Sequence, residues 1–469
     1  MFVKRTFQDY EAVAGSKLPF IVQTIADYKN SDEFLWAKTA TQYFEAGNTK
    51  VTEKKILRAN VVTAKGENGV QKTLQKAAIV GNQVRSNFLF RFVTQQNQFL
   101  LGNGVTLSDE NEKAKLGLGF DKAMEQAGEK ALLHGVCWAY WNLDHIEIIP
   151  AYSDDMSGFV ALLDERTGKA RVGIHFWQMQ TDRPMYFRLF EEDGLTEYVS
   201  TKDGVREVAP KRAYVETWAQ DVTGARELVS VQNYTTLPLV PFFASESKSS
   251  ELNMAIKTKI DMYDNIMSDF GDNLEKANDV YWVLNNFGGT STEILETIQQ
   301  IEELRAVVNI SDGMGNGSTA HPEAFEVPYA ARQTALEILR KELHNDYMAL
   351  NKNELTGGSL TNVAIEAAMI DMNLKADRYE WQAFQFVQGV LALAGVHTEK
   401  ITFKRQTIVN RSETVNDIAV MRQDIDQETA LKLNPYIMQE EIEKIIANTA
   451  AEQLSGMPTV EMLERVTEE

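Results

Sequence analysis

The chain has 469 residues, enough for about two to four domains, and its apolar and charged shares of 44% and 24% are ordinary for a globular protein. Asp and Glu total 67 against 47 for Lys and Arg, and the net charge of −20 argues against a protein that wraps nucleic acid through phosphate contacts. The acidity does not exclude a protein that lets DNA pass without holding it. A surface that merely keeps the protein dispersed explains the charge equally well.

The single cysteine, Cys137, lies in an apolar run and is expected to be a small buried side chain, so no disulfide or cysteine-based zinc site forms within the chain. The first ten residues lack the apolar core of a signal peptide, and no stretch approaches about 18 consecutive apolar residues. We therefore expect a cytoplasmic protein without a transmembrane helix.

Residues 1 to about 145 are predicted to be mostly helical, with periodic apolar residues over Lys72–Ala78, Asn82–Leu100 and Asp121–Leu133. From Gly135 the pattern changes to short segments rich in β-type and aromatic residues, separated by Asp-Gly and Thr-Gly turn signals. This pattern predicts antiparallel hairpins. The expected strands are Val136–Asn142, Ile146–Ile149, Ala170–Gln178, Pro184–Glu191, Thr196–Ser200, Arg206–Ala209 and Tyr214–Trp218.

The stretch from Ser250 to Ala394 is predicted to form a helix, a compact insert, a second helix, a loop and a long third helix. Apolar residues three and four apart define each helix, and Pro328 lies just inside the start of the second. A third helix continuous from Asn362 to Ala394 would be about 50 Å long at about 1.5 Å per residue. Periodicity is equally compatible with a helical hairpin in an ordinary core.

The insert between the first two helices is expected to hold a strand, a short helix and two more strands, at Val280–Leu284, Thr292–Arg305, Ala306–Ile310 and Ala324–Val327. Three glycines at 313, 315 and 317 make a flexible link within it. After the third helix, a strand is expected at Ile401–Val409. The polar tail from Glu413 is predicted to be helical, with breaks at Asn434-Pro435 and at Gly456-Met457-Pro458.

No motif in the sequence supports catalysis. The six histidines are scattered and form no metal-ligand spacing: His134, His145, His175, His321, His344 and His397. The glycine-rich run Gly313–Ser318 lacks the lysine of a phosphate-binding loop, and no Gly-x-Ser-x-Gly elbow is present. We therefore expect no enzyme, cofactor or metal, although an unfamiliar active site stays open.

The order of several short motifs is more informative. Leu239-Val240-Pro241-Phe242 leads into the first long helix, which carries Ile260-Asp261-Met262-Tyr263-Asp264 and then Asp272-Asn273-Leu274. This arrangement resembles the P-F…LID-Y-N…N-L pattern of portal proteins of tailed bacteriophages, particularly siphophages of Gram-positive hosts. Thr361-Asn362-Val363-Ala364, running to Leu374-Lys375-Ala376, is similar to the SGvAl…L…Ka start of that family's long helix, with Thr361-Asn362 in place of Ser-Gly.

The resemblance covers roughly residues 70 to 410 and implies an α+β portal fold. Such a fold has a mainly helical wing, a two-helix stem, a small α/β clip, a long helix behind a tunnel loop, and a helical crown. By that analogy the segments are wing 1–245, first stem helix 246–278, clip 279–327, second stem helix 328–350, tunnel loop 351–361, wing helix and strand 362–410, and crown with tail 411–469.

The resemblance also implies a function without catalysis. A portal protein is the head-to-tail connector: a ring, commonly of twelve copies, at one capsid vertex of the virion, assembled in the host cytoplasm. Double-stranded DNA is packaged and ejected through its tunnel. The implied partners are other copies, the terminase large subunit, head completion or adaptor proteins, and the major capsid and scaffolding proteins, with no membrane. The alternatives are another ring-forming virion adaptor and, more distantly, a cytoplasmic hydrolase.

Two sets of residues are expected to carry this role. Helices that face identical neighbours need a second buried side, and the large side chains that offer interface area are Tyr263, Phe270, Tyr347 and Trp381. Tyr281 and Trp282 are also expected at the subunit interface, because the insert that carries them is too small to bury them alone. The loop from Asn351 to Thr361 joins two long helices and is expected to face DNA through Lys352, Asn353, Glu354, Gly357 and Gly358. A plain solvent-exposed connection is the alternative for this loop.

Overall fold

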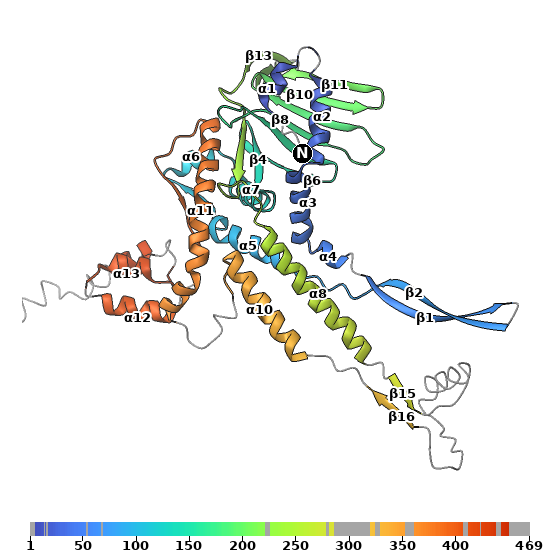
Figure 1. Cartoon of the computed structure of the whole chain (residues 1–469). Coiled ribbons are helices and arrows are strands. Elements are labelled where there is room, and N and C mark those ends of the chain that lie inside the picture. Colours follow the sequence, from blue (N-terminus) through green and yellow to red (C-terminus); the bar gives the residue numbers. More distant parts are fainter. Residues whose placement is uncertain are drawn as a thin grey trace, which may run out of the picture.

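The computed structural model of the chain has an α+β fold in which helices and antiparallel sheets follow one another along the sequence (Figure 1). The structure describes residues 5–13, 15, 17–52, 55–66, 69–220, 226–277, 281–285, 319–323, 329–351, 361–406, 411–422, 424–437 and 442–449. The expected α+β class is confirmed.

Six antiparallel strands form a meander in which each strand pairs with the next one along the chain. They are β6 Tyr152–Asp154, β7 Ser157–Leu163, β8 Ala170–Trp177, β9 Met185–Glu191, β10 Gly194–Thr201 and β11 Gly204–Arg212. Alternate side chains point to opposite faces, so Val172, Ile174 and Phe176 of β8 all lie on one side. There they share a buried cluster with three helices, α1 Phe7–Ala12, α2 Leu18–Lys29 and α3 Asp32–Phe44.

The opposite face of the meander packs on a smaller sheet in the order β14-β4-β5. Phe159, Phe190 and Leu195 of the meander lie in one buried cluster with Trp138 and Tyr140 of β4. The strands of the smaller sheet are β4 Val136–Asn142, β5 His145–Pro150 and β14 Leu239–Phe243, and a separate hairpin joins β12 Val215–Gln220 to β13 Arg226–Gln232. The meander is therefore covered on both faces.

The largest buried cluster joins parts of the chain that are far apart in sequence. Its members include side chains from β4, β14 and α3 and from five further helices, α5 Phe88–Leu101, α7 Phe120–His134, α8 Met254–Ala277, α10 Tyr329–Tyr347 and α11 Asn362–Ala394. Phe386, Val387 and Val390 of α11 are almost completely buried in it. Each such side chain contributes about 1.5–3 kcal/mol to folding, so this cluster holds together segments that lie between α3 and residue 403.

Three of these helices approach closely at Gly128 of α7. A Cβ atom there would lie 2.4 Å from the Tyr379 hydroxyl and 2.5 Å from Asn97 Oδ1. The Tyr379 hydroxyl donates a hydrogen bond to the same Asn97 oxygen at 3.1 Å. Any side chain at position 128 would therefore push α5 and α11 away from α7.

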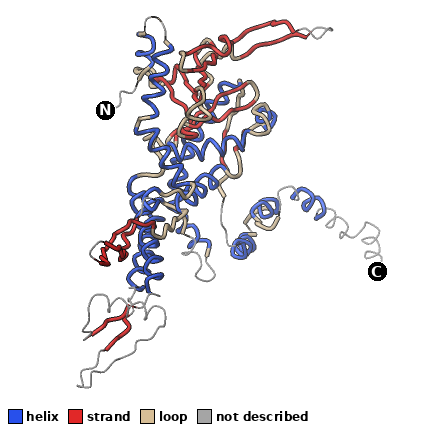
Figure 2. The backbone as a smooth tube through the Cα atoms, turned by 90° about the vertical axis from the view of Figure 1, so that its right-hand side faces the viewer, coloured by secondary structure: helices blue, strands red, loops and turns tan. Residues whose placement is uncertain are grey.

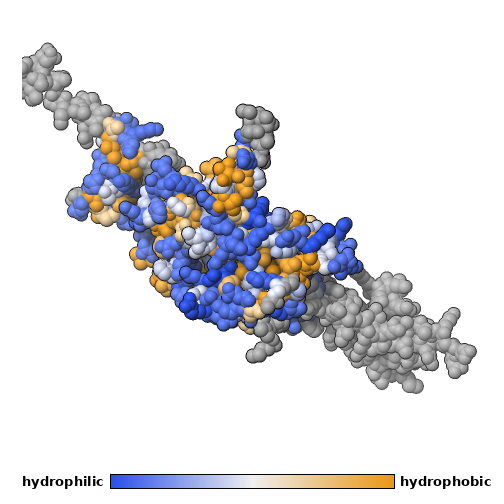
Figure 3. All heavy atoms as spheres, turned by 90° about the horizontal axis from the view of Figure 1, so that it is seen from above, coloured by the Kyte–Doolittle hydropathy of each residue, from blue (hydrophilic) through white to orange (hydrophobic). Residues whose placement is uncertain are grey.

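Two parts project from this body (Figures 1 and 2). The helices α8 and α10 extend together, and beyond them lies the hairpin of β15 Tyr281–Asn285 and β16 Thr319–Glu323. A longer hairpin, β1 Lys55–Gly66 and β2 Gly69–Val80, projects beside α8 after the short helix α4 Thr49–Thr52. Seen from above, apolar residues gather in several patches on the described surface (Figure 3).

Residues 81–87, which we call the strap, connect β2 to α5 and run alongside α8. Backbone N–H groups that are two residues apart in the strap donate hydrogen bonds to side chains that are four residues apart in α8. The pairs are Asn82 with Asp272 Oδ1 at 2.7 Å, Val84 with Ser268 Oγ at 3.0 Å, and Ser86 with Asp264 Oδ1 at 2.9 Å. Two residues of extended chain advance about 6.7 Å and four residues of helix advance about 6.0 Å. These repeat distances are similar, so donors and acceptors stay opposite one another over three hydrogen bonds.

Asp264 is the most enclosed member of this ladder. Its carboxylate also accepts a hydrogen bond from Asn48 Nδ2, whose amide donates to the Ser86 carbonyl at 3.1 Å. Burial raises the pKa of Asp264, and the hydrogen bonds from Ser86 and Asn48 oppose that rise. A buried carboxyl group is thus satisfied by donors that come only from the strap and from the turn before α4.

The prediction of a helical segment over Lys72–Ala78 is wrong. These residues belong to β2, which pairs with β1 in one continuous register from Lys55 opposite Val80 to Gly66 opposite Gly69. Apolar residues at 70, 74 and 78 are four apart, and this spacing fits a helix as well as a strand. The Gly-Glu-Asn-Gly sequence that separates the two strands is a turn signal that the prediction did not use. The helix expected from Asn82 begins only at Phe88, because the strap occupies the residues before it.

Several strands escaped the sequence analysis, namely β1, β3, β6, β7, β13, β14 and β16. Pro241 lies inside β14, where it is tolerated because β14 is an edge strand. The strand expected at Ile401–Val409 is formed only over β17 Ile401–Phe403, which pairs with β3 Val105–Leu107. The segments Thr292–Arg305, Ala306–Ile310 and Ala324–Val327 lie outside the described residues.

Other expectations are confirmed. The helix α7 covers the one expected from Asp121, and β4 has its predicted bounds. The third helix runs from Asn362 to Ala394 as predicted, between the N-cap Thr361, whose hydroxyl accepts from Ala364 N, and Gly395 with φ 66°. The other helices are α6 Glu110–Ala114, α12 Arg411–Met421 and α13 Gln427–Leu433, the last of which ends before Asn434-Pro435.

Replacing Asp264 with Ala should free the strap from α8. The N–H of Ser86 and the amide of Asn48 would lose their acceptor at a cost of about 1–3 kcal/mol per buried donor. Hydrogen exchange of residues 81–87 should then speed up by roughly tenfold or more. Thr334→Ala on the exposed side of α10 is the control and should leave the exchange unchanged; equal rates in both variants would show that the ladder does not hold the strap.

Candidate functional site

The antiparallel helices α8 and α10 are held in the body at their inner ends. Ile256 and Ile260 of α8 and Leu343 and Tyr347 of α10 are all at most 2% exposed and belong to the central cluster. Just outside them, Lys259 Nζ lies 2.6 Å from Asp346 Oδ2. The apolar residues anchor the pair, while the exposed ion pair adds little.

A buried lysine joins the inner ends of the pair to the long helix. Lys375 of α11 donates from Nζ to the Tyr347 carbonyl at 2.8 Å and forms an ion pair of 2.7 Å with Glu251, which precedes α8. Its ammonium group also lies 3.3 Å from the centre of the Tyr347 ring. Burial lowers the pKa of Lys375, and the Glu251 carboxylate opposes this shift.

Tyr347 completes this junction. Its ring stacks on Phe92 of α5 with centroids 4.6 Å apart, and its hydroxyl donates to Gln96 Oε1 at 2.8 Å. Because the ring and the hydroxyl contact α5 while the carbonyl contacts α11, the position of α10 is fixed relative to both helices. The junction therefore determines where the projecting pair leaves the body.

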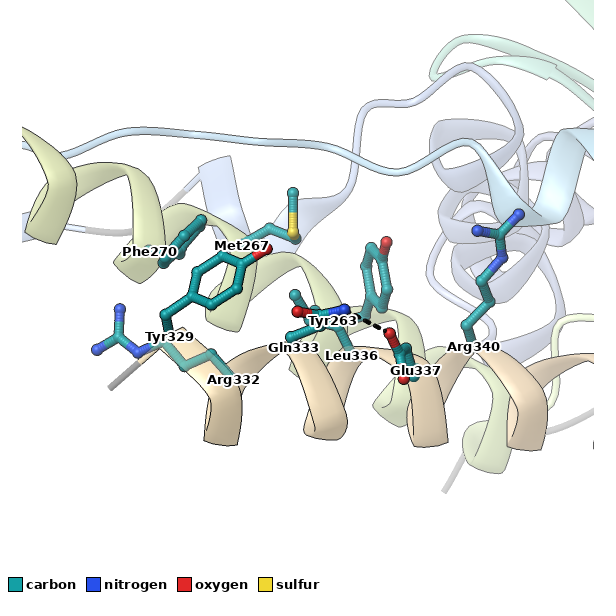
Figure 4. A pocket seen from close by; sticks show the side chains of 9 residues that line it. All are labelled: Tyr263, Met267, Phe270, Tyr329, Arg332, Gln333, Leu336, Glu337 and Arg340. Atoms are coloured by element: carbon teal, nitrogen blue, oxygen red, sulfur yellow. Dashed lines mark hydrogen bonds between the residues drawn. The ribbon is translucent and has the colours of Figure 1, made fainter. Parts of the chain in front are cut away.

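Toward their outer ends the two helices leave a groove between them, which we call the distal groove (Figure 4). It holds about 200 Å³ of space and is lined by Tyr263, Met267, Phe270, Tyr329, Arg332, Gln333, Leu336, Glu337 and Arg340. Phe270 and Tyr329 face each other across it with centroids 5.9 Å apart. An apolar cavity of about 150 Å³ accommodates benzene, so the groove has room for one large side chain.

Two arginines on α10 give the distal groove a positive character. Arg332 donates to the Asp269 carbonyl at 3.2 Å, whereas Arg340 Nε is enclosed and has no hydrogen-bond partner among the described residues. Positions 332, 336 and 340 are four apart and lie on one side of the helix. A groove with aromatic walls and guanidinium groups suits an apolar segment that carries carboxylates.

Comparison with known proteins identifies the family. Residues 37–454 match the family described as phage portal protein, SPP1 Gp6-like. The chain belongs to this family of phage portal proteins. Family membership makes it a structural phage protein and not an enzyme, as the sequence analysis expected.

Two portal proteins illustrate the similarity. The portal protein of Clostridium phage phiCD119 is 26% identical over 247 residues, which cover 49% of this chain and 53% of that protein. The portal protein of Bacillus phage SPP1 is 24% identical over 400 residues, covering 75% of this chain and 73% of that protein. The chain thus spans about half the length of the first relative and about three quarters of the second.

The predicted site residues of this portal family member fall into three groups, apart from Tyr347, which is buried in the central cluster of its own chain, and Trp381, which is exposed on α11. Tyr263 and Phe270 lie on the side of α8 that faces α10 and line the distal groove; Tyr263 also packs edge-on against Phe88 with centroids 5.0 Å apart. Tyr281 and Trp282 lie on β15, whose backbone alone is described. The loop residues Lys352, Asn353, Glu354, Gly357 and Gly358 lie outside the described residues.

The sequence analysis missed Lys375, Arg332 and Arg340 as functional candidates. The arginine spacing on the α8-facing side of α10 was visible in the sequence, but basic residues on a helix usually indicate a solvated face. In the described ranges, no three or more His, Cys, Asp or Glu side chains gather at a place that could hold a metal ion. None of the described helices combines the length and apolarity that crossing a bilayer requires.

The anchoring of the helix pair can be tested by comparing a core residue with the ion pair. Leu343→Ala should destabilise the inner end of α10 by about 2–5 kcal/mol because it leaves a cavity in the central cluster. Lys259→Ala should cost about 1 kcal/mol or less. Hydrogen exchange of residues 329–347 measures both; similar losses in the two variants would contradict an anchor made mainly of apolar contacts.

Proposed function

We propose that this chain forms a ring, of twelve copies, at one vertex of a phage capsid, and that double-stranded DNA is packaged and ejected through its centre. The observation that carries the proposal is the portal family match over residues 37–454. The projecting helix pair supports it, because two helices anchored at one end and open at the other suit packing against identical neighbours. The family match argues against the alternative of a cytoplasmic hydrolase.

The proposed division of the chain follows the family resemblance. Residues 1–245 and 362–410 form the wing, α8 and α10 the stem, 279–327 the clip, and 411–469 the crown. We propose that the terminase large subunit, and later the head completion or adaptor proteins, dock on the clip, and that capsid and scaffolding proteins contact the rest of the ring. Tyr263, Phe270, Tyr281 and Trp282 contribute to contacts between copies.

The loop at 351–361 is the part proposed to face DNA. It follows the junction at Tyr347 and precedes the N-cap Thr361, so both of its ends are attached to ordered helices. Lys352 and Glu354 place one positive and one negative charge in it, which suits brief contacts with phosphates better than a basic cluster. The glycines 357 and 358 supply the conformational freedom of a hinge.

The charge of the chain suits passage of a polyanion. A ring of twelve copies would carry roughly −240 in all, so phosphates are repelled and few counterions are released on contact. DNA can then slide without being held.

Assembly is tested by native mass spectrometry, which should detect a ring near twelve copies. Trp282→Asp should reduce ring formation and leave the helical content nearly unchanged, because a charged side chain opposes burial at a subunit contact. Leu118→Asp is the control, since Leu118 is fully exposed. A monomer at every concentration would refute the ring, and normal rings from the Trp282→Asp variant would remove Trp282 from the interface.

The role of the loop is tested by replacing Gly357 and Gly358 together with Ala. The stiffer loop should lower packaging or retention of DNA, measured as nuclease-protected DNA per particle, while rings still form. Gly119→Ala is the matched control, because Gly119 has φ −90° and no atom within 4 Å of an added Cβ. Unchanged packaging in the double variant would contradict a hinge in the tunnel.

A further inference from the structure

The long helix α11 carries an uncovered apolar face. Four of its large apolar side chains are more than half exposed, at 73%, 54%, 53% and 53% for Val363, Ile370, Leu374 and Trp381. Their spacings of seven, four and seven residues keep them within roughly 20° of one line along the helix. We call this line the stripe, and it extends about 27 Å at about 1.5 Å per residue.

The stripe lies opposite the face that α11 buries in its own chain. The buried residues are Ile365, Met369, Met372, Ala376, Tyr379, Ala383, Phe386, Val387 and Val390. At about 100° per residue their average direction is roughly 200° from the stripe. A helix that is apolar on two opposite sides is normally covered on both. The stripe is exposed in the described part of the single chain, so it lacks the cover that such a side normally has.

Carboxylates border the stripe. Glu366 and Asp371 are exposed, lie on the two sides of its N-terminal half, and have no ion pair or hydrogen bond in the described part of the chain, while the exposed Arg378 borders its C-terminal half. An apolar surface with acidic margins fits a surface of the same size that is apolar with basic margins.

Such a surface lies on the other flank of the body. At the first turn of α5, Phe90 is 41% exposed and packs on Phe44 with centroids 5.1 Å apart, and Val84 of the strap, six residues earlier in the chain, is 39% exposed. Arg85 and Arg91 are exposed there, and within the described residues neither forms an ion pair. We call these five residues the flank patch.

The positions of the two surfaces suit a contact between copies. In Figure 1, α11 lies along one edge of the body, while the start of α5, reached from β2 through the strap, lies toward the opposite edge at a similar height. Two different complementary surfaces on opposite flanks give a head-to-tail contact, and such contacts form a ring when the rotation between copies closes.

We propose that the stripe of one copy packs against the flank patch of the next copy, with Trp381 and Leu374 on Phe90 and with Glu366 and Asp371 near Arg85 and Arg91. This inference rests on the proposed ring, and its partner is a second copy of this chain. A second copy is the favoured partner of the stripe, because its flank patch has an apolar centre with basic margins and lies on the opposite flank. If another phage protein or the crown of the same chain covered the stripe, the flank patch would have no matching surface.

Charge reversal tests the pairing. Glu366→Lys with Asp371→Lys should raise the protein concentration for half assembly by about tenfold or more, and so should Arg85→Glu with Arg91→Glu. The chain that carries all four changes should return to within about threefold of the original, which also shows that the variants fold. Lys341→Glu on the exposed side of α10 is the control; no recovery in the fourfold variant would overturn the pairing.

Cysteine cross-linking identifies the partner surface directly. The one native thiol, Cys137, is completely buried, so Leu374→Cys and Phe90→Cys can be introduced in the full chain without removing it. A short bismaleimide should convert rings of this double variant into covalent multimers, whereas Leu374→Cys with Leu118→Cys should stay monomeric on a denaturing gel. Intact rings without the first cross-link would overturn this inference alone, and absence of rings would refute the ring and the inference together.

Discussion

The architecture depends on one buried cation. The Lys375 ammonium is shared by the Tyr347 carbonyl at the end of α10 and the Glu251 carboxylate before α8, and it lies over the Tyr347 ring. A buried lysine is tolerated only when its charge is paired and its donors are used, so this group requires α8, α10 and α11 to meet at one point. The directions in which the helix pair and the long helix leave the body follow from that requirement.

The remaining contacts divide into those that a single chain satisfies and those that it leaves open. The strap ladder satisfies the polar side of α8, and the central cluster covers the inner halves of α8 and α10. The distal groove, the stripe and the flank patch keep large apolar side chains uncovered. Stability of the isolated chain is thus concentrated near the junction, and the outer parts keep apolar surface uncovered.

Sequence patterns predicted those elements whose local signals agree with their environment. The predicted bounds of α11 agree with the N-cap at Thr361 and the left-handed Gly395 after its last turn, and the predicted bounds of β4 agree with the ends of its apolar run. The helix expected at Lys72–Ala78 failed, since an apolar spacing of four in a short segment does not separate helix from strand; only pairing with β1 decides it. Lys375 could not be identified as the junction, because its burial follows from long-range packing that no local pattern contains.

The meander has a consequence for the order in which the chain folds. Its six strands pair with their sequence neighbours, and its covering helices and the smaller sheet all lie before residue 244. The central cluster, in contrast, needs α11 and β17 near residue 400. Because local contacts form early and distant ones late, we infer that the meander becomes compact on the ribosome, while α8 and α10 are anchored only after the last quarter of the chain is made. Arrested nascent chains of increasing length, probed by pulse proteolysis, would show protection of the meander first if this order holds.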